Sequence, residues 1–551
     1  MHATIHSAAL CGAEATPVEV QVDLSLGLPG FFVVGLPDAA CVDAKVRCST
    51  ALRNAGFVLP QKRATINLAP GDLPKHGALF DLPIALGLLA AAGQLPDEAL
   101  ERLASTLVVG ELSLGGDVLP VRGVLPIALL ARARGPLTLL VPEGNEREAL
   151  QVPGAQVLGV ATLQEAVAAL LDPQAHRAGS LLRARPALLL AAGEPLGTPP
   201  DLSDVRGQLE CKRAMEVAAS GGHNALLIGP PGSGKTMLAR RLPGLLPPLS
   251  FEEALEATSL WSVAGRLRPG MGLLQERPFR APHHSISVAG LVGGGVPPRP
   301  GEISLAHNGV LYLDELPEFG RAALEALRAP IEDGEVTVVR ARGSASLPCR
   351  FMLVASMNPC PCGYLAGPHS NRCRCTLAAQ ASYRRRISGP ILDRFDLHLD
   401  APAIEPSDLW GGPDGESTKT VRDRVLKARA VQRARYAKVS GLYCNAQLRG
   451  KSLRELVQAT PEALSLLGRA MKHLRLSARA HDRILKVART IADLDCASRV
   501  AAPHVHEALQ YRSLDRPIEP GARGPALPPH PPALAGTPPP GPLGVRELDE
   551  G

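Results

Sequence analysis

At 551 residues the chain is too long for a single hydrophobic core, so roughly two to four domains are expected. Hydrophobic residues make up 45% and charged residues 20%, which is typical of folded globular proteins and excludes fibrous or wholly disordered classes. The formal net charge of +6 is small for this length. It permits contact with nucleic acid through local patches but does not predict it.

No segment predicts a membrane span, because a span needs about 18 consecutive apolar residues and the longest apolar stretches contain Pro or Gly. The first residues, MHATIHSAAL, lack the basic segment, apolar block and cleavage site of a secretory signal. The 11 cysteines show no disulfide framework. We therefore expect a cytoplasmic protein with reduced thiols and no membrane partner.

The first 171 residues alternate short apolar or β-branched runs with helical patterns. Strands are expected at residues 18–22, 31–34, 64–68, 106–109 and 137–141. Helices are expected at residues 42–55, 79–92, 125–133 and 163–171. This alternation predicts an α/β or α+β domain over residues 1–171.

The composition divides the rest of the chain into four parts. Residues 172–200, rich in Pro, Arg, Ala and Gly, predict a linker. A second α/β domain is expected at 201–406 and a helical domain at 407–513. The tail at 514–551 contains PALPPHPPALAGTPPPGPLG and is expected to be disordered. The fold class is therefore multidomain α/β.

A glycine-rich segment follows the apolar run ALLI and precedes a helical pattern. It reads G-x-x-x-x-G-K-T and consists of Gly229, Pro230, Pro231, Gly232, Ser233, Gly234, Lys235 and Thr236. In this setting backbone N–H groups turn toward phosphates, Lys235 meets the β- and γ-phosphates and Thr236 holds Mg²⁺. A chance Gly-rich turn before a lysine accounts less well for the flanking strand and helix. ATP and Mg²⁺ are the predicted cofactors.

Three later segments supply the partners that such a loop needs. The run VLYL ends in Asp314 and Glu315: Asp314 can hold Mg²⁺ and Glu315 can polarise the attacking water, although helix N-termini also carry acidic pairs. The run FMLVA leads to Asn358, either a water-orienting residue or a turn residue before proline. Arg394, in ILDRFD, is either an arginine finger for a neighbouring subunit or part of a surface ion pair.

Taken together, these segments resemble the ComM/YifB family in the magnesium-chelatase-like branch of AAA+ proteins. The resemblance rests on PHHSIS, AGLVGGG, PRPGEISLAHNGVLYLDELPEF, MNPCPCG, LKVARTIADL and, nearer the N-terminus, GLPGFFVVGLPDAA and NLAPGDLPKHGALFDLPIALG. It covers residues 1–513. It implies a bacterial homohexameric ring, with an AAA+ core and a helical lid, that binds ATP at subunit interfaces.

The resemblance also implies site residues and an activity. It suggests Arg394 as the finger and Arg479 as a lid arginine for the nucleotide of its own subunit, with Arg483 as a competitor. The implied activity is a DNA helicase that drives branch migration while transforming DNA is integrated. Residues 331–343 predict a hairpin that places Arg340 and Arg342 in a DNA-contacting pore loop, or an ordinary surface hairpin. The basic stretch RDRVLKARAVQRAR predicts either a DNA-binding helix or a solvated one.

The first domain resembles the proteolytic domain of Lon-type proteases, within the ribosomal-protein-S5-like fold. Such a domain needs a serine nucleophile and a downstream lysine that takes its proton. Leu79 and Leu125 stand at those two positions here. Neither side chain can attack or accept a proton, so we expect no proteolysis.

Four cysteines form two C-x-C pairs separated by ten residues: Cys360, Cys362, Cys373 and Cys375. Four thiolates complete a closed tetrahedral zinc site, although this spacing is tighter than in most zinc knuckles. His369 is a possible substitute ligand, and four reduced thiols in a loop are the alternative. We expect structural zinc, with the other cysteines as small buried residues.

Two function classes follow. The leading hypothesis is an ATP-driven DNA motor. The alternative is a chelatase-type AAA+ chaperone that remodels a protein partner, and the fused Lon-like domain and the four-cysteine insert favour the first.

Overall fold

The computed structural model of the chain describes residues 2–59, 61–135, 137–177, 200–268, 271–295, 297–340, 343–365, 370–403, 415–439 and 441–515. Within these ranges no helix is long and apolar enough to cross a bilayer. The tail predicted at 514–551 lies outside them from residue 516 onward, as do residues 178–199 of the predicted linker.

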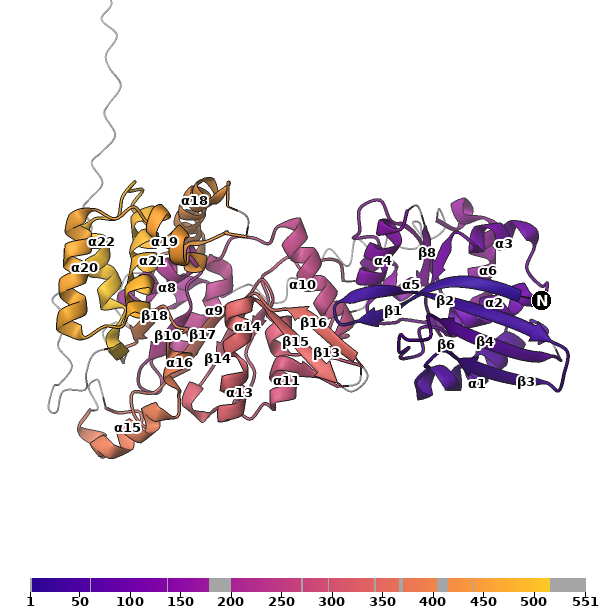
Figure 1. Cartoon of the computed structure of the whole chain (residues 1–551), viewed down its shortest axis with the longest axis horizontal. Coiled ribbons are helices and arrows are strands. Elements are labelled where there is room, and N and C mark those ends of the chain that lie inside the picture. The colour runs from indigo at the N-terminus through magenta and orange to yellow at the C-terminus, as the bar shows by residue number, and fades with distance from the viewer. Residues whose placement is uncertain are drawn as a thin grey trace, which may run out of the picture. The chain divides into compact units, whose positions relative to one another are not determined.

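A seven-stranded mixed sheet organises the N-terminal region, in the order β3-β4-β2-β1-β5-β8-β9 (Figure 1). Its strands are β1 (His2–Cys11), β2 (Glu14–Ser25), β3 (Gly30–Val34), β4 (Arg63–Ala69), β5 (Thr106–Val108), β8 (Thr138–Pro142) and β9 (Gln156–Val160). β2 pairs antiparallel with β1 and β4, and the other neighbours run parallel. Every second side chain of β2 from Val18 to Leu24 is buried, because alternate residues face opposite sides of a sheet.

The helices of this region enclose one apolar core with the sheet. They are α1 (Ala39–Asn54), α2 (Asp81–Ala91), α3 (Asp97–Leu103), α4 (Val124–Ala133), α5 (Glu143–Ala149) and α6 (Leu163–Leu171), with a small ladder of β6 (Glu111–Leu112) and β7 (Val118–Leu119). Almost every residue of α2 is buried, which its unbroken apolar sequence requires. Asp38 caps α1 by accepting a hydrogen bond from the backbone of Cys41.

The second sheet has five parallel strands in the order β11-β14-β17-β10-β18. They are β10 (Ala225–Ile228), β11 (Phe279–Arg280), β14 (Val310–Leu313), β17 (Met352–Met357) and β18 (Leu397–Asp400). All residues of β10, β14 and β17 are buried, as expected for parallel strands covered on both faces. The register pairs Ile228 with Met357 and Leu313 with Ala355, so these three strands end at the same edge.

Helices and two hairpins surround this sheet. The helices are α8 (Leu209–Gly221), α9 (Lys235–Leu245), α10 (Phe251–Val263), α11 (Val288–Val292), α12 (Glu302–Leu305), α13 (Arg321–Ala326), α14 (Arg328–Asp333), α15 (Leu377–Arg385) and α16 (Gly389–Leu392). The hairpins are β12 (Gly293–Gly294) with β13 (Arg299–Pro300), and β15 (Glu335–Arg340) with β16 (Gly343–Pro348). The hairpin expected at 331–343 is therefore present, shifted toward the C-terminus. Single 3₁₀ turns lie at Leu202–Asp204, Leu316–Glu318 and Ser370–Arg372.

The C-terminal region is helical, as predicted. It contains α18 (Thr418–Tyr436), α19 (Gly450–Leu456), α20 (Pro461–Leu474), α21 (Ala478–Leu494) and α22 (Ala502–Gln510), with 3₁₀ turns at Asn445–Gln447 and Ser513–Asp515. Its apolar faces share one buried cluster with α8, α9 and β10. The buried ring of His223 joins the two regions, with Nδ1 3.0 Å from Asp396 and Nε2 2.8 Å from the hydroxyl of Thr490.

Some predictions of local structure were incomplete or wrong. β1 and β9 were not predicted, and residues 173–177 are helical rather than part of a linker. The ring of His176 contacts the Gly159 carbonyl at 2.6 Å, which holds this turn on β9. Cys11 and Cys496 are exposed, so not every remaining cysteine is the small buried residue we expected.

Candidate functional site: a nucleotide cavity at the strand ends

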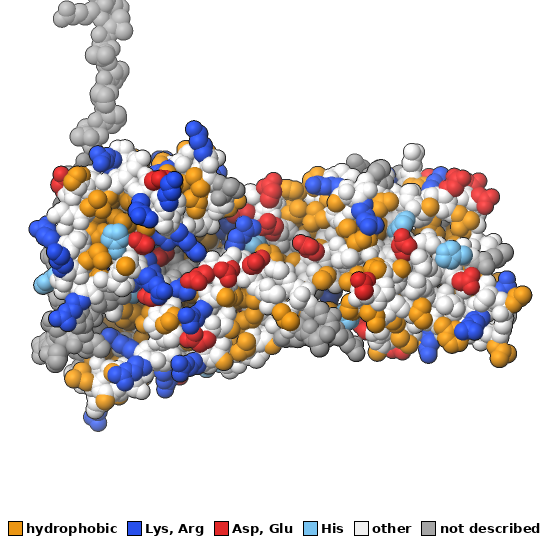
Figure 2. All heavy atoms as spheres, in the orientation of Figure 1, with side chains coloured by type: hydrophobic (Ala, Val, Ile, Leu, Met, Phe, Trp, Pro, Cys, Tyr) orange, Lys and Arg blue, Asp and Glu red, His pale blue; other side chains and the backbone are white. Residues whose placement is uncertain are grey.

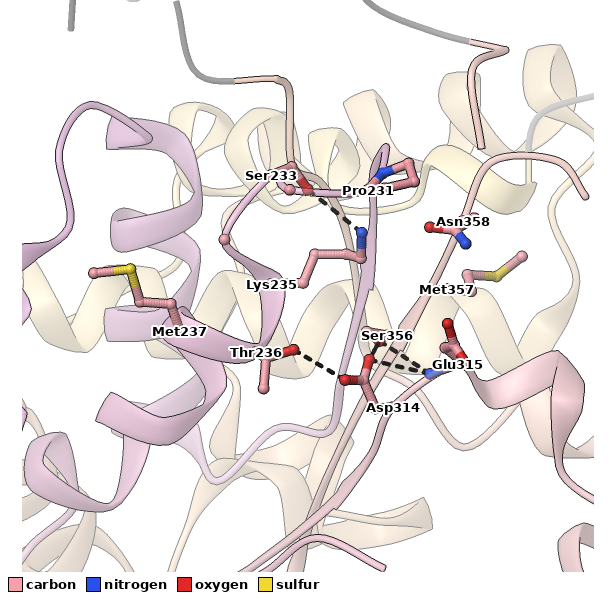
Figure 3. Close-up of a pocket in the computed structure, with 12 residues that line it drawn as sticks. Pro231, Ser233, Lys235, Thr236, Met237, Asp314, Glu315, Ser356, Met357 and Asn358 are labelled. Carbon is pink, nitrogen blue, oxygen red and sulfur yellow. Dashed lines mark hydrogen bonds between the residues drawn. The ribbon is translucent and has the colours of Figure 1, made fainter. Parts of the chain in front are cut away.

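The glycine-rich loop lies between β10 and α9, in the strand–loop–helix arrangement that the sequence predicts (Figure 3). Gly232 and Gly234 have φ of 77° and 78°, which L side chains rarely adopt. A Cβ added at either glycine meets nothing within 4 Å, so the loop is open on that side. Lys235 opens α9, and its Nζ donates to the carbonyls of Gly229 and Pro230 at 2.8 Å each.

A cavity of about 410 Å³ opens beside this loop. The volume falls within the range of about 300–1,000 Å³ typical of small-molecule sites. Burial lowers the pKa of Lys235 below its ordinary value, while the carboxylates of Asp314 and Glu315 oppose that shift. The cavity is lined by Pro231, Gly232, Ser233, Gly234, Lys235, Thr236, Met237, Asp314, Glu315, Ser356, Met357 and Asn358. It thus brings together the predicted loop, acidic pair and asparagine.

Asp314 accepts hydrogen bonds from three hydroxyl groups. Thr236 Oγ1 donates to its Oδ2 at 3.0 Å, and the Tyr312 hydroxyl donates to its Oδ1 at 3.0 Å. The Ser356 hydroxyl also donates to Oδ1. Burial opposes ionisation, but these hydrogen bonds outweigh it and hold the pKa of Asp314 below its ordinary value. An ionised carboxylate beside a threonine hydroxyl provides the oxygen ligands that Mg²⁺ prefers.

Glu315 has a left-handed backbone, with φ of 54°, which is uncommon for a residue other than glycine. Its N–H stabilises this turn by donating to Ser356 Oγ at 3.2 Å and to Asp314 Oδ1 at 3.1 Å. Its side chain is 55% exposed, and Oε2 lies 3.7 Å from Nδ1 of His284. An accessible carboxylate at the edge of the cavity is suited to accept a proton from water.

Asn358 follows β17 and is in contact with the segment that carries the first cysteine pair. A Cβ added at Gly363, where φ is 84°, lies 2.6 Å from Pro231 Cδ and 3.9 Å from Asn358 Cγ. Only glycine fits against the phosphate loop at this point. The backbone of Asn358 also hydrogen-bonds the side chain of Tyr383 in α15, whose pKa burial raises to about 12. The cysteine segment is thus joined to the cavity on two sides.

The sulfur ligand atoms of Cys360, Cys362, Cys373 and Cys375 lie within 4.8 Å of one another. Cys360 Sγ is 3.3 Å from that of Cys362 and 3.8 Å from that of Cys373. Zn–S bonds of about 2.3 Å in a tetrahedron separate the sulfurs by about 3.8 Å, so this set fits such an ion. Burial raises the pKa of Cys360 to about 12, and a backbone hydrogen bond from Tyr364 lowers that of Cys362 to about 7. His369 lies outside the described residues.

Comparison with known proteins finds family models and relatives that match most of the chain. The family model described as "Magnesium chelatase, subunit ChlI" matches residues 201–409, "Subunit ChlI of Mg-chelatase" matches 20–145, and "Magnesium chelatase, subunit ChlI C-terminal" matches 415–512. The uncharacterized protein YifB of Escherichia coli is 45% identical over 513 residues, covering 93% of this chain and 97% of that protein. The competence protein ComM of Haemophilus influenzae is 43% identical over 518 residues, covering 94% and 98%.

The chain belongs to the ComM/YifB family of magnesium-chelatase-like AAA+ proteins. In this chain, the phosphate loop and the acidic pair indicate an ATPase. A further similarity concerns a shorter stretch: Lon protease 2 of Bacillus subtilis is 30% identical over 117 residues, which is 21% of this chain and 20% of that protein.

The arginines that the family resemblance suggests lie together, but outside the cavity. Arg394 forms an ion pair with Glu332. Arg479 Nη1 donates to Asp393 Oδ2 at 3.0 Å, and Arg483 Nη1 donates to Asp393 Oδ1 at 3.3 Å. Neither Arg394 nor Arg479 is among the described residues that line the cavity. The proposed contacts of both with nucleotide remain predictions.

The sequence suggested two basic segments as possible DNA contacts, the hairpin of β15 and β16 and the helix α18. Arg340 is the last residue of β15, and Arg342 lies outside the described residues. In α18, Arg424 pairs with Glu416 at 2.7 Å, and Arg435 pairs with Asp493. Arg429 donates to the Ala219 carbonyl at 2.8 Å. These three arginines bind groups within the chain, which neither the DNA-binding nor the solvated interpretation of this helix anticipated.

The positions that would carry proteolytic chemistry are apolar and buried. Leu79 is 8% exposed, and Leu125 is fully buried in the N-terminal core. The ionisable groups nearby serve the fold: Arg47 binds both oxygens of buried Asp81, at 2.6 and 2.9 Å. The Lys75 amine binds the Pro70 carbonyl. The absence of proteolytic activity from this domain stays a prediction.

Three residues that contact the acidic pair were not assigned from sequence: Tyr312, Ser356 and His284. Ser356 could have been found by aligning β14 with β17, because the pairing of Leu313 with Ala355 brings the next residues, Asp314 and Ser356, together. Tyr312 precedes Asp314 by two residues, a spacing that puts both side chains on one side of a strand. His284 comes from the loop after β11, and no local signal connects it with Glu315.

Proposed function

We propose that this chain is the subunit of an ATP-driven homohexameric ring that unwinds DNA and promotes branch migration, in the bacterial cytoplasm. The observation that supports this most directly is the joining of Thr236 and Asp314 in one cavity with Lys235 and Glu315. This set supplies phosphate binding, magnesium ligation and water activation in the arrangement that nucleotide-driven motors need.

The residues of the cavity fit ATP and Mg²⁺ in distinct roles. Bound Mg²⁺ neutralises charge that develops on the phosphates. Thr236 and Asp314 would hold the ion, and the lowered pKa of Asp314 keeps its carboxylate ionised. Lys235 would exchange the carbonyls of Gly229 and Pro230 for phosphate oxygens. Glu315 would take a proton from the attacking water, which Asn358 helps to orient.

The ring completes the site in this proposal. Arg394 would leave Glu332 and stabilise the phosphates bound by the neighbouring subunit, as an arginine finger does. Arg479 would contribute to a nucleotide after release from Asp393. DNA would pass close to the β15–β16 hairpin, where Arg340 and Arg342 are candidate phosphate contacts.

Purified protein and a synthetic three- or four-stranded DNA junction provide the test. The wild-type protein should separate or migrate the junction only with ATP and Mg²⁺, and Lys235→Ala and Glu315→Gln should abolish the reaction. Equal strand separation by all three proteins would refute an ATP-driven motor. ATPase activity without any response to DNA would refute DNA as the substrate.

A second function has specific support from the family models, which are named for a magnesium-chelatase subunit. In this alternative the ring remodels a protein partner, as a chaperone. The DNA motor and the chaperone can be distinguished by the molecule that stimulates ATP turnover. Stimulation by single-stranded or branched DNA favours the motor, whereas stimulation only by a protein favours the chaperone.

We also propose that the four cysteines hold a structural zinc ion. The support is the fit of their sulfur separations to a tetrahedral ion, together with four thiols and no open position. Metal analysis of the purified protein should give about one zinc per chain. Cys360→Ser and Cys373→Ser should lose it, and an equal zinc content in wild type and both variants would refute the site.

A further inference from the structure

The segment from the second cysteine pair through α15 concentrates positive charge. Residues 370–386 read SNRCRCTLAAQASYRRR and contain five arginines and no acidic residue. The chain as a whole has 59 Lys and Arg against 53 Asp and Glu, so this segment departs from a nearly balanced background. Figure 2 shows Lys and Arg side chains gathered on the surface around α15, at the lower left of the view.

Most of these arginines have no acidic partner in the part of the chain that the structure describes. Arg372, Arg374, Arg385 and Arg386 are exposed, and Arg384 is half-buried. Arg386 pairs with Glu318 at 2.8 Å. Among the residues that the structure describes, the other four have no carboxylate within 4.0 Å, and their charge faces solvent.

The cysteine cluster is continuous with this basic segment. Cys373 and Cys375 both place their sulfurs in the cluster, and Arg374 between them is exposed. Gln380 Nε2 donates to the Cys375 carbonyl at 3.1 Å and joins this segment to α15. Thr376 caps α15 by accepting from the backbone of Ala379 at 3.2 Å. The arginines therefore stand on one rigid support, which reduces the entropy lost when they bind a ligand.

α18 is also basic, but two of its arginines, Arg424 and Arg435, are bound to carboxylates of the same chain. In the segment 370–386 only Arg386 has a carboxylate partner among the described residues, and guanidinium groups without such partners match phosphate oxygens in geometry and charge. The sole aromatic residue here, Tyr383, is 5% exposed and gives no platform for base stacking.

We propose that Arg372, Arg374, Arg384 and Arg385, held by the four-cysteine cluster, form a binding surface for the phosphate backbone of DNA. This inference rests on the proposed function as a DNA motor and adds a second contact region to that of the β15–β16 hairpin. Because the contacts are to phosphates, binding is independent of base sequence and sensitive to salt.

The test uses the full-length chain with a non-hydrolysable ATP analogue and a fluorescently labelled poly-dT strand. Binding is measured by anisotropy over a range of salt concentrations. The triple variant Arg372→Ala, Arg374→Ala, Arg385→Ala should bind roughly tenfold more weakly, and its slope of log affinity against log salt should fall by about 2, at about 0.7 per lost contact. The corresponding Lys triple variant should retain most of the slope.

The matched control removes the same charge from α18. Arg422, Lys427 and Arg433 are exposed there, and their triple Ala variant should bind poly-dT as the wild type does. A duplex of the same length, measured in parallel, shows whether the phosphates that bind belong to one strand or two. Zinc content and nucleotide binding should be unchanged in both triple variants.

Three results overturn the inference. One is an unchanged slope of log affinity against log salt in the triple variant of the segment 370–386. This result would not contradict the proposed DNA motor. Another is an equal loss in the α18 control, which would mean a general charge effect. The third is that the triple variant of this segment no longer forms the oligomer but still binds DNA, which would identify the surface as a subunit contact. Failure of the wild type to bind any DNA would instead refute the proposed function.

Discussion

One aspartate lies in the N-terminal core and another at the edge of the five-stranded sheet, and the two differ in burial and in what surrounds the carboxylate. Asp81 lies in the N-terminal core, where burial raises its pKa despite the hydrogen bonds and charge of Arg47. Asp314 is only partly buried, and hydrogen bonds from Ser356, Thr236 and Tyr312 outweigh burial and lower its pKa. Arg47 binds both oxygens of Asp81, whereas Asp314 lines an open cavity. The carboxylate suited to bind a ligand is the one that is partly exposed, beside a cavity, with hydroxyl groups as its partners.

The largest effect should follow from changing the acidic residue that is free to react. Glu315→Gln keeps the size and hydrogen-bonding backbone of the residue but removes its capacity to accept a proton. We expect ATP turnover to fall by about 10²–10⁴-fold with nucleotide binding retained. Steady-state ATPase measurements check this, and Glu252→Gln, at an exposed position of α10, is the control. Near-normal turnover in Glu315→Gln would remove this residue from the mechanism.

A smaller effect should follow from removing one hydroxyl that holds Asp314. Ser356→Ala deletes a hydrogen bond to the ionised form, so the pKa of Asp314 should rise. Because the carboxylate would then protonate sooner as pH falls, Mg²⁺-dependent nucleotide binding should fail at higher pH, by about one unit. Binding of a fluorescent ATP analogue across acidic pH measures this shift.

The control for that measurement is Ser259→Ala, because the Ser259 hydroxyl is buried in α10 and has no hydrogen-bond partner among the described residues. Its pH profile should match that of the wild type. If the Ser356→Ala profile also matches, the hydrogen bond does not determine the charge of Asp314.

A third change tests whether the cysteine cluster supports the cavity from outside. Cys373→Ser removes one of the four proposed zinc ligands, and Gly363, the residue after Cys362, lies close to Pro231 of the phosphate loop. We expect loss of zinc and roughly threefold weaker nucleotide binding, or about 0.7 kcal/mol. Cys11→Ser, at an exposed thiol, is the matched control. Unchanged nucleotide affinity after zinc loss would show that the cluster and the cavity are independent.

The smallest effect on activity is expected in the N-terminal region. Leu79→Ser introduces a hydroxyl at the position of the missing nucleophile, but that position is buried, and Leu125 at the other position cannot take the proton. We expect no peptidase activity on labelled casein and a stability loss of about 2–4 kcal/mol by thermal unfolding. Leu79→Met should cost less than about 1.5 kcal/mol. Serine-dependent cleavage of casein would contradict this interpretation.

Sequence patterns predicted the parts of the site that lie at strand ends. Apolar runs of four or five residues gave β10, β14 and β17, and the residues after them meet at one cavity as expected. The groups that Lys235 and Arg394 bind in this structure could not be predicted from the sequence, because they depend on how side chains of different segments pack. β1 was missed because its ten residues include His, Thr, Ser and Cys among few large apolar side chains.

The close contact between Gly363 and Pro231 also has a consequence for the evolution of the two loops. A side chain at 363 would collide with the proline ring and would strain a backbone at φ of 84°. The first constraint disappears if position 231 becomes smaller, whereas the second remains. We therefore expect the two positions to vary together among homologues: sequences without a proline in the phosphate loop should be the ones that tolerate asparagine in place of the glycine.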